Sequence, residues 1–221
     1  MDVHRLSRQL GIAPEHLLRE EHALLILRGL LEHEIGSFLI FKGGTALRLA
    51  YGSPRFSDDL DFSATAPISG RTFTHAAREA ARPLPQLTLV EALPKRFTLF
   101  ALYRVRDPSL PYAFAVRVEI STRPEEWQRG RDFDLRLLTS PVTPLTVLAQ
   151  VATLERLWTD KAAALTERRQ PRDLYDLWFI AQKLRREFAP DLRGFDRRVI
   201  RRELRKYLPR PQWQVIEQWS G

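Results

Sequence analysis

The sequence of 221 residues contains no cysteine and no asparagine, and it has a single methionine. Without cysteine the chain can form no disulfide framework, thiolate nucleophile or cysteine-bound zinc site. No apolar run approaches the roughly 18 to 20 residues that a membrane span requires. The opening MDVHRLSRQL also lacks the apolar stretch of a signal peptide. We therefore expect a globular cytoplasmic protein with no membrane attachment.

Lysine is scarce as well, at five of the 35 basic residues. This bias, together with the missing asparagine, fits a GC-rich genome or a warm-living organism. The net charge is +8 and the sequence pI is near 10.3, which favours a polyanionic partner. Residues 185–221 hold ten Lys or Arg against five Asp or Glu, so the excess of positive charge concentrates at the C-terminal end.

Hydrophobic periodicity predicts an α+β core followed by helices. Alternating or short apolar runs bounded by turn residues predict strands at residues 37–41, 59–63, 86–92, 96–105, 112–121 and 132–139. Helical spacing predicts helices at residues 15–34, 45–52, 69–82, 145–167, 173–186 and 195–207. We therefore expect a domain over residues 1–140 that begins with a helix, and a helical domain over 141–221 with a basic C-terminal face.

Three acidic residues stand out on two of these strands. Asp59 and Asp61 are two apart and so face the same side of a strand, where their carboxylates repel each other unless a cation lies between them. Glu119 projects from the polar face of the strand 112–121. Hard divalent ions prefer carboxylate oxygens together with substrate phosphates. The three acids predict a site for one or two Mg²⁺ (or Mn²⁺) ions that support in-line phosphoryl transfer.

A glycine turn precedes the acids by about fifteen residues. Gly43, Gly44 and Thr45 stand where a strand passes into a helix, so their backbone N–H groups are expected to hold the triphosphate of an NTP. Ser57, two residues before Asp59, is expected to contact phosphate or to orient the loop. Each part alone has a simpler interpretation. The glycines could form an ordinary turn, Asp59 and Asp61 could lie on a solvated loop or strand edge, and Glu119 could be a surface residue or pair with Arg117. Their order along the chain favours the palm of a nucleotidyltransferase.

Three segments carry a family resemblance. FKGGTALRLAY with RFSDDLDFS, then VRVEIS, then TDKAAALTERRQPRDLYDLWFI resemble, in that order, the motifs of the AbiEii/MenT-like nucleotidyltransferase toxins. This family belongs to the DNA polymerase β-type superfamily, and the resemblance runs from about residue 38 to 180. It implies a polymerase β-type palm, a mixed sheet flanked by helices, followed by a helical part. It also implies transfer of a nucleoside monophosphate from an NTP to an acceptor hydroxyl, with a cognate antitoxin as partner.

The resemblance assigns roles by position. Asp59 and Asp61 match the paired metal ligands, and Glu119 matches the third ligand, although Asp is commoner there in the superfamily. Lys161 matches the lysine that reaches the nucleotide phosphates. Asp173, preceded by Arg172 at the nucleotide site, matches the acidic helix start that closes the active site. From the residues alone, Lys161 is also compatible with a surface lysine, and Asp173 with a favourable first-turn acid.

The C-terminal segment FDRRVIRRELRKYLPR places six cations in two adjacent rows of a helix. Such a surface fits a nucleic-acid backbone and predicts strongly salt-dependent binding. It is equally compatible with a solvated face or with an acidic antitoxin. The residues predicted to bind RNA are Arg197, Arg198, Arg201, Arg202, Arg205 and Lys206.

Together these observations predict a Mg²⁺-dependent nucleotidyltransferase toxin that modifies an RNA acceptor. Since several relatives modify the 3′ end of tRNA and so block translation, tRNA is the acceptor that the resemblance favours. Two alternatives remain open. The palm could modify a hydroxyl of a protein or small molecule, or the chain could be a non-catalytic nucleotide-binding module.

Overall fold

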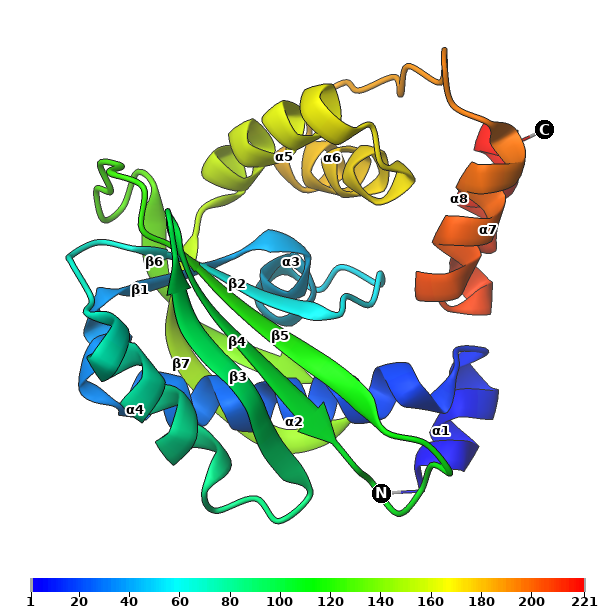
Figure 1. The fold of residues 1–221 in the computed structure, drawn as a ribbon. Coiled ribbons are helices and arrows are strands. Elements are labelled where there is room, and N and C mark those ends of the chain that lie inside the picture. Colours follow the sequence, from blue (N-terminus) through cyan, green and yellow to red (C-terminus); the bar gives the residue numbers. More distant parts are fainter. Residues whose placement is uncertain (1, 221) are drawn as a thin grey trace.

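The computed structural model describes residues 2–220, and of Ser220 the backbone alone. Its centre is a seven-stranded mixed sheet in the order β3-β4-β5-β2-β1-β7-β6 (Figure 1). The pairs β2–β5 and β1–β7 are parallel, and the other neighbours are antiparallel. The strands are β1 (Leu39–Lys42), β2 (Asp59–Ala64), β3 (Leu87–Lys95), β4 (Thr98–Val105), β5 (Phe114–Ser121), β6 (Phe133–Ser140) and β7 (Thr143–Ala152).

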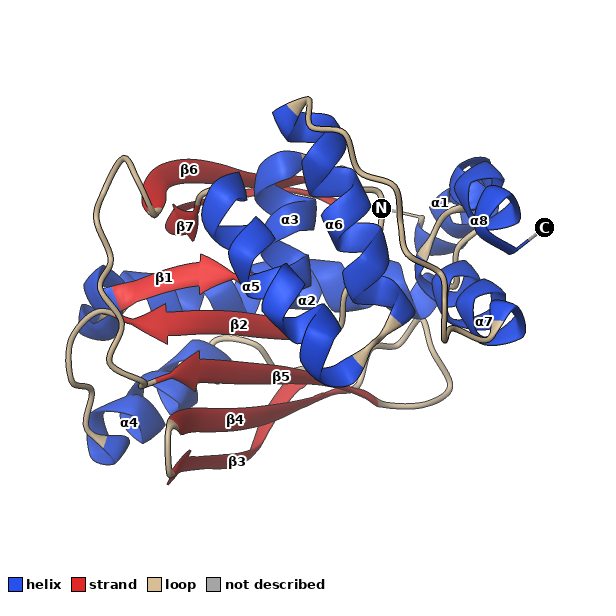
Figure 2. Ribbon diagram, turned by 90° about the horizontal axis from the view of Figure 1, so that it is seen from above, coloured by secondary structure: helices blue, strands red, loops and turns tan. Residues whose placement is uncertain are grey.

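Helices cover both faces of the sheet. Seen from above in Figure 2, α3, α5 and α6 lie over one face, while α2 and α4 lie beneath the other. No helix in the described part of the chain is long and apolar enough to cross a membrane. The helices are α1 (Val3–Leu10), α2 (Pro14–Glu32), α3 (Gly43–Tyr51), α4 (Gly70–Ala81), α5 (Leu154–Arg168), α6 (Pro171–Leu184), α7 (Arg197–Tyr207) and α8 (Trp213–Ser220).

Two apolar cores hold these layers together. The larger core lies between the sheet and the helices beneath it, where residues such as Leu24 of α2 and Val118 of β5 have no exposed surface. The smaller core joins Ile40 of β1 to Ile180 of α6 and Leu204 of α7. The C-terminal helices therefore share one apolar core with strand β1 of the sheet. That packing fixes α5 above the carboxyl end of β2 and β5.

The predicted mixed α+β fold is confirmed, with one wrong assignment. The leucines of residues 145–167 suggested one helix, but this stretch contains the end of strand β7 and then α5. β7 pairs with β1 on one side and with β6 on the other, and its threonines and valines suit a strand. Because of β7 the sheet extends to Ala152, past the predicted domain boundary at residue 140. The division into two domains stays a prediction.

Smaller differences occur at the ends of elements. Residues Glu34–Phe38 form a 3-10 turn, so the predicted strand at 37–41 begins only at Leu39. Helices α1 and α8 lie where no helix was predicted. α1 is a single short amphipathic helix capped by Asp2, whose side chain accepts a hydrogen bond from the backbone N–H of Arg5.

Candidate active site

Two of the predicted acidic ligands lie opposite each other in the sheet. β2 and β5 pair in parallel, and their register places Asp61 directly beside Glu119. The flanking residues Leu60 and Val118 are fully buried in the core, so the two acids share the opposite face of the sheet. Neighbouring strands of a sheet lie about 4.8 Å apart. Two acids 58 positions apart in the chain are thus brought together by strand pairing alone.

A cleft of about 380 Å³ opens between this face of the sheet and α5. Asp61 and Glu119 line its floor, and small and charged side chains of both signs from α5 form its roof. Its size suits a small-molecule ligand. The residues that line the cleft include Lys42, Gly43, Asp61, Thr98, Glu119, Arg123, Lys161 and Arg168.

The glycine turn borders the same cleft. Gly43 has a left-handed backbone with φ +78, and a Cβ at this position would lie 2.2 Å from Oδ2 of Asp61. A Cβ at Gly44 would lie 2.3 Å from Nη2 of Arg55 and 2.8 Å from Oγ of Ser57. Both positions therefore require glycine. Gly43 allows the start of α3 to lie against Asp61, and Gly44 leaves space for the side chains of Arg55 and Ser57.

The side chain of Thr45 points into the protein, while its role at the nucleotide stays a prediction. Its side chain is buried, and its hydroxyl donates a hydrogen bond of 2.5 Å to the backbone carbonyl of Asp59. The hydroxyl is thereby used inside the protein and fixes the start of β2 against α3. The backbone N–H groups at the start of α3 remain the groups of this turn that suit an anion.

Asp59 is engaged by a guanidinium group. Arg117 of β5 binds both carboxylate oxygens, with Nε–Oδ1 at 2.7 Å and Nη2–Oδ2 at 3.0 Å. This bidentate geometry is the strong form of the arginine–carboxylate contact. Within residues 2–220 no three acidic or histidine side chains lie close enough together to hold a metal ion. Asp61 and Glu119 are therefore adjacent, whereas Asp59 is turned toward Arg117.

The electrostatics of the cleft nevertheless fit a divalent cation. Burial, together with the charges of Asp59 and Glu119, raises the pKa of Asp61 from 3.8 to about 6 against the opposing charges of Lys161 and Lys42. An acid whose pKa rises in this way lacks compensating positive charge. Carboxylate oxygens are the ligands that Mg²⁺ prefers, so Asp61 and Glu119 could hold such an ion. Asp59 would complete the set on leaving Arg117.

Lys161 lies at the roof of the cleft within a buried ion-pair network. Its Nζ contacts Oδ1 of Asp173 at 2.9 Å and Oδ2 of Asp176 at 2.8 Å. Asp176 also binds the buried Arg55 through both oxygens, at 2.7 and 2.8 Å. Although burial opposes it, hydrogen bonds from Arg168 and the charge of Lys161 lower the pKa of Asp173 to about 2. The network fixes the position of Lys161 at the roof of the cleft.

Asp173 itself is fully buried and does not line the cleft, so it acts on the site through Lys161 and Arg168. Arg172 also does not line the cleft, and its Nε is buried with no hydrogen-bond partner among the described residues. The roles predicted for these two residues stay predictions.

Sequence reasoning missed several charged residues of the site. Arg168 lines the cleft and binds Asp173 at 2.7 and 2.8 Å. Its spacing of seven from Lys161 would place both on one helix face, which is the signal that could have revealed it. Lys42 lies directly before the glycine turn and faces Asp160 of α5 at 3.7 Å. The role of Arg55 had no signal, because its partner Asp176 lies 121 positions away.

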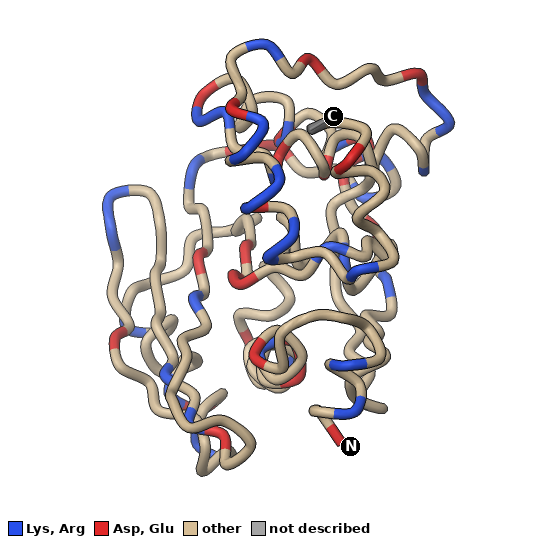
Figure 3. The backbone as a smooth tube through the Cα atoms, turned by 90° about the vertical axis from the view of Figure 1, so that its right-hand side faces the viewer, with Lys and Arg blue, Asp and Glu red and all other residues tan. Residues whose placement is uncertain are grey.

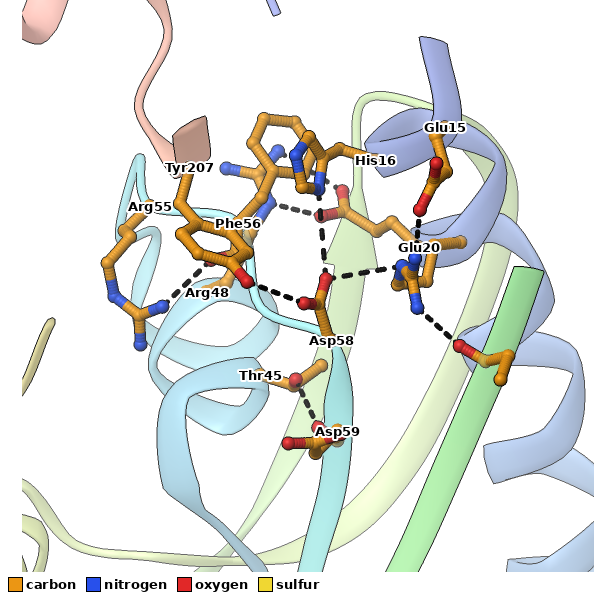
Figure 4. A network of polar contacts seen from close by, with 12 residues as sticks. Glu15, His16, Glu20, Thr45, Arg48, Arg55, Phe56, Asp58, Asp59 and Tyr207 are labelled. Carbon is orange, nitrogen blue, oxygen red and sulfur yellow. Dashed lines mark hydrogen bonds and ion pairs between the residues drawn. The ribbon is translucent and has the colours of Figure 1, made fainter. Parts of the chain in front are cut away.

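Asp58 belongs to a different contact set, shown in Figure 4. It accepts a hydrogen bond of 2.7 Å from the hydroxyl of Tyr207 and lies 3.2 Å from Nε of Arg19. His16 packs near it, at 3.8 Å. These contacts join α2, the start of β2 and the end of α7. Asp58 therefore has a structural role next to the site.

The predicted RNA-binding residues of α7 lie outside the cleft, and none of the six lines it. Ile200 and Leu204 are fully buried, so the helix packs through the face expected for it. Glu217 of α8 interrupts the basic surface, since it pairs with Arg201 at 3.4 Å and with Arg205 at 2.6 Å. In Figure 3 acidic residues are interspersed with the basic ones throughout the chain.

Comparison with known proteins settles the family. The model of the family described as "Nucleotidyl transferase AbiEii toxin, Type IV TA system" matches residues 25–217. The chain belongs to this family. Its members are nucleotidyltransferase toxins of toxin–antitoxin systems, so an antitoxin is the expected partner of this AbiEii protein. No curated protein matches the sequence.

Solved structures share the fold of this AbiEii chain. The nucleotidyltransferase toxin MenT4 from Mycobacterium tuberculosis H37Rv has 22% sequence identity and a TM-score of 0.60, over 91% of this chain and 68% of that one. JHP933 from Helicobacter pylori has 23% identity and a TM-score of 0.56, over 77% of this chain and 68% of its own. At these identities the likeness concerns the fold, a mixed sheet flanked by helices.

Proposed function

We propose that this AbiEii-family protein is a Mg²⁺-dependent nucleotidyltransferase that transfers a nucleoside monophosphate from an NTP to an RNA acceptor, the 3′ end of tRNA. Such a modification would block translation until a cognate antitoxin neutralises the enzyme. The observation that carries the proposal is the pair Asp61 and Glu119, side by side on parallel strands at a cleft that also contains a glycine turn and Lys161.

The nucleotide would lie with its triphosphate between the start of α3 and the roof of the cleft. The free backbone N–H groups in the first turn of α3, which begins at Gly43, favour the binding of an anion. Lys161 and Arg168, both of which line the cleft, supply positive charge at the leaving pyrophosphate. The ion pairs to Asp173 hold these two cations in place before substrate binds, so little reorganisation is needed during the reaction.

In the transfer step the acceptor hydroxyl forms a bond to the α-phosphorus, and the bond from that phosphorus to pyrophosphate breaks. Glu119, which is exposed on the floor of the cleft, accepts the hydroxyl proton. A bound Mg²⁺ would neutralise charge on the transferring phosphoryl group. Asp61 and Glu119 would hold it, together with Asp59. Ser57, beside Gly44, is in a position to orient the glycine turn.

The test is incubation of the purified protein with α-labelled NTPs, Mg²⁺ and separate pools of RNA, protein and small-molecule acceptors. We expect label in the RNA pool, concentrated in tRNA, and loss of that label in Asp61→Ala. Label in the protein or small-molecule pool alone would assign a different acceptor. The absence of pyrophosphate release under all conditions would contradict the enzyme itself.

A further inference from the structure

An aromatic side chain projects from the turn between β3 and β4. Arg96 and Phe97 form this two-residue turn, and neither has a positive φ. Phe97 is 43% exposed. The guanidinium carbons of Arg96 and Arg123 lie 5.0 and 5.9 Å from the centroid of its ring. The turn therefore presents an exposed aromatic ring flanked by two cations.

The positive charge at this turn is not neutralised. Lys95, Arg96 and Arg123 are all exposed, and none forms an ion pair within the part of the chain that the structure describes. The tip of this hairpin is the blue turn that projects on the left in Figure 3. On α7, by contrast, Arg205 is paired with Glu217 at 2.6 Å. The hairpin tip is thus a stronger candidate for binding phosphate groups than the face of α7.

The hairpin tip borders the active-site cleft. Thr98 and Arg123 line the cleft, and the carbonyl of Phe97 accepts a hydrogen bond of 3.0 Å from the backbone N–H of Thr122. In the register of β4 and β5, Phe100 is opposite Glu119. Phe97 lies three positions from Phe100, a distance of about 10 Å along the strand. A bound polymer strand that extends from Phe97 to Glu119 would therefore run along the cleft.

We propose that the hairpin tip, formed by Lys95, Arg96, Phe97 and Arg123, is the platform on which the acceptor RNA lays its unpaired 3′ strand. The proposal rests on the nucleotidyltransferase activity proposed above. Single-stranded nucleic acids bind by stacking bases on aromatic rings while cations follow the backbone. Stacked nucleotides rise by about 3.4 Å each, so a hydroxyl at Glu119 places roughly the third nucleotide over Phe97. The acceptor must then have about three unpaired 3′ nucleotides.

The test measures RNA binding without NTP, so that it does not depend on catalysis. Fluorescein-labelled RNA hairpins with 3′ overhangs of zero to about five nucleotides are titrated with protein and followed by anisotropy. Wild-type affinity should rise until the overhang reaches about three nucleotides. Phe97→Ala should bind overhangs of that length about tenfold more weakly, or about 1.4 kcal/mol, and blunt hairpins unchanged. Arg96→Ala and Arg123→Ala should each lower the salt slope by about 0.7.

Two matched variants control for general effects. Tyr112, 53% exposed and located just before β5, is an aromatic residue away from the hairpin tip, and Arg8 is an exposed cation on α1. Tyr112→Ala and Arg8→Ala should bind every RNA as the wild type does. Equal binding of overhangs by Phe97→Ala and wild type would overturn the platform, as would an equal loss in Tyr112→Ala. A Phe97→Tyr variant should retain affinity, because it keeps the ring.

The same RNAs are then offered with α-labelled NTP and Mg²⁺. Transfer of label by both wild type and Phe97→Ala, with equal RNA affinity, would leave the enzyme standing and reject the platform. Overhang binding that depends on Phe97, without transfer to any RNA, would reject the proposed reaction and retain the platform as a binding site.

Discussion

Replacing Asp61 with asparagine should stabilise the metal-free protein while removing its activity. Burial and neighbouring acids raise the pKa of Asp61 from 3.8 to about 6, so the folded protein binds this proton more tightly than the unfolded chain does. The stability gained from this proton is complete below 3.8 and is lost as the pH rises through about 6. A pKa difference of this size corresponds to about 3 kcal/mol.

Because Asp61 is partly exposed, solvent screening should reduce the effect to about 1 to 2 kcal/mol in the free energy of unfolding at pH 7.5. Urea unfolding in the presence of EDTA measures it. At pH 4.5 the wild-type carboxyl is largely protonated, so the advantage of Asp61→Asn should shrink. Mg²⁺ should raise the Tm of the wild type more than that of the variant.

Asp59→Asn, on the same strand, is the matched control. It removes the bidentate partner of Arg117, so it should not stabilise the protein. The reasoning would be refuted if Asp61→Asn were less stable than the wild type at pH 7.5. It would also be refuted by an equal gain at both pH values, because ionisation of the Asp61 carboxyl could not then be the cause.

Three further substitutions test other parts of the site. Gly43→Ala should lower the free energy of unfolding by more than the roughly 1 to 2 kcal/mol of left-handed strain, because the added Cβ would meet the carboxylate of Asp61. Gly52, with φ +75 and open space around it, is the control: in urea unfolding Gly52→Ala should show the cost of the strain alone. Asp176→Ala should cost about 3 to 5 kcal/mol by thermal unfolding, since it leaves a buried guanidinium unpaired, whereas the exposed Asp191→Ala should leave the Tm unchanged. Arg117→Gln should lower the Kd for Mn²⁺ in calorimetry by releasing the carboxylate it binds; an unchanged or higher Kd would show that this ion pair does not compete with metal.

Local sequence patterns predicted much of the sheet. Alternating polar and apolar residues in 112–121 placed Glu119 on the face opposite the core, and β5 has that alternation. The Asp-x-Asp spacing likewise placed Asp59 and Asp61 on one side of β2. These inferences succeed because side-chain direction in a strand depends only on the position along it. Their roles in catalysis stay predictions.

Long-range pairing was not predictable in the same way. The leucines of β7 suggested the start of a helix. The segment is a strand because it pairs with β1 on one side and β6 on the other, and its own residues do not reveal those partners. The engagement of Asp59 by Arg117 depends on the exact register of β2 and β5. The network around Lys161 joins α5, α6 and the loop before β2, so its members are far apart in sequence.

The most direct test of the account is Mn²⁺ binding in the presence of a non-hydrolysable NTP, measured by electron paramagnetic resonance for wild type, Asp61→Asn and Glu119→Gln. We expect bound Mn²⁺ in the wild type and a large loss of affinity in each variant, with the fold retained. Undiminished binding in both variants would show that these adjacent carboxylates do not hold the metal.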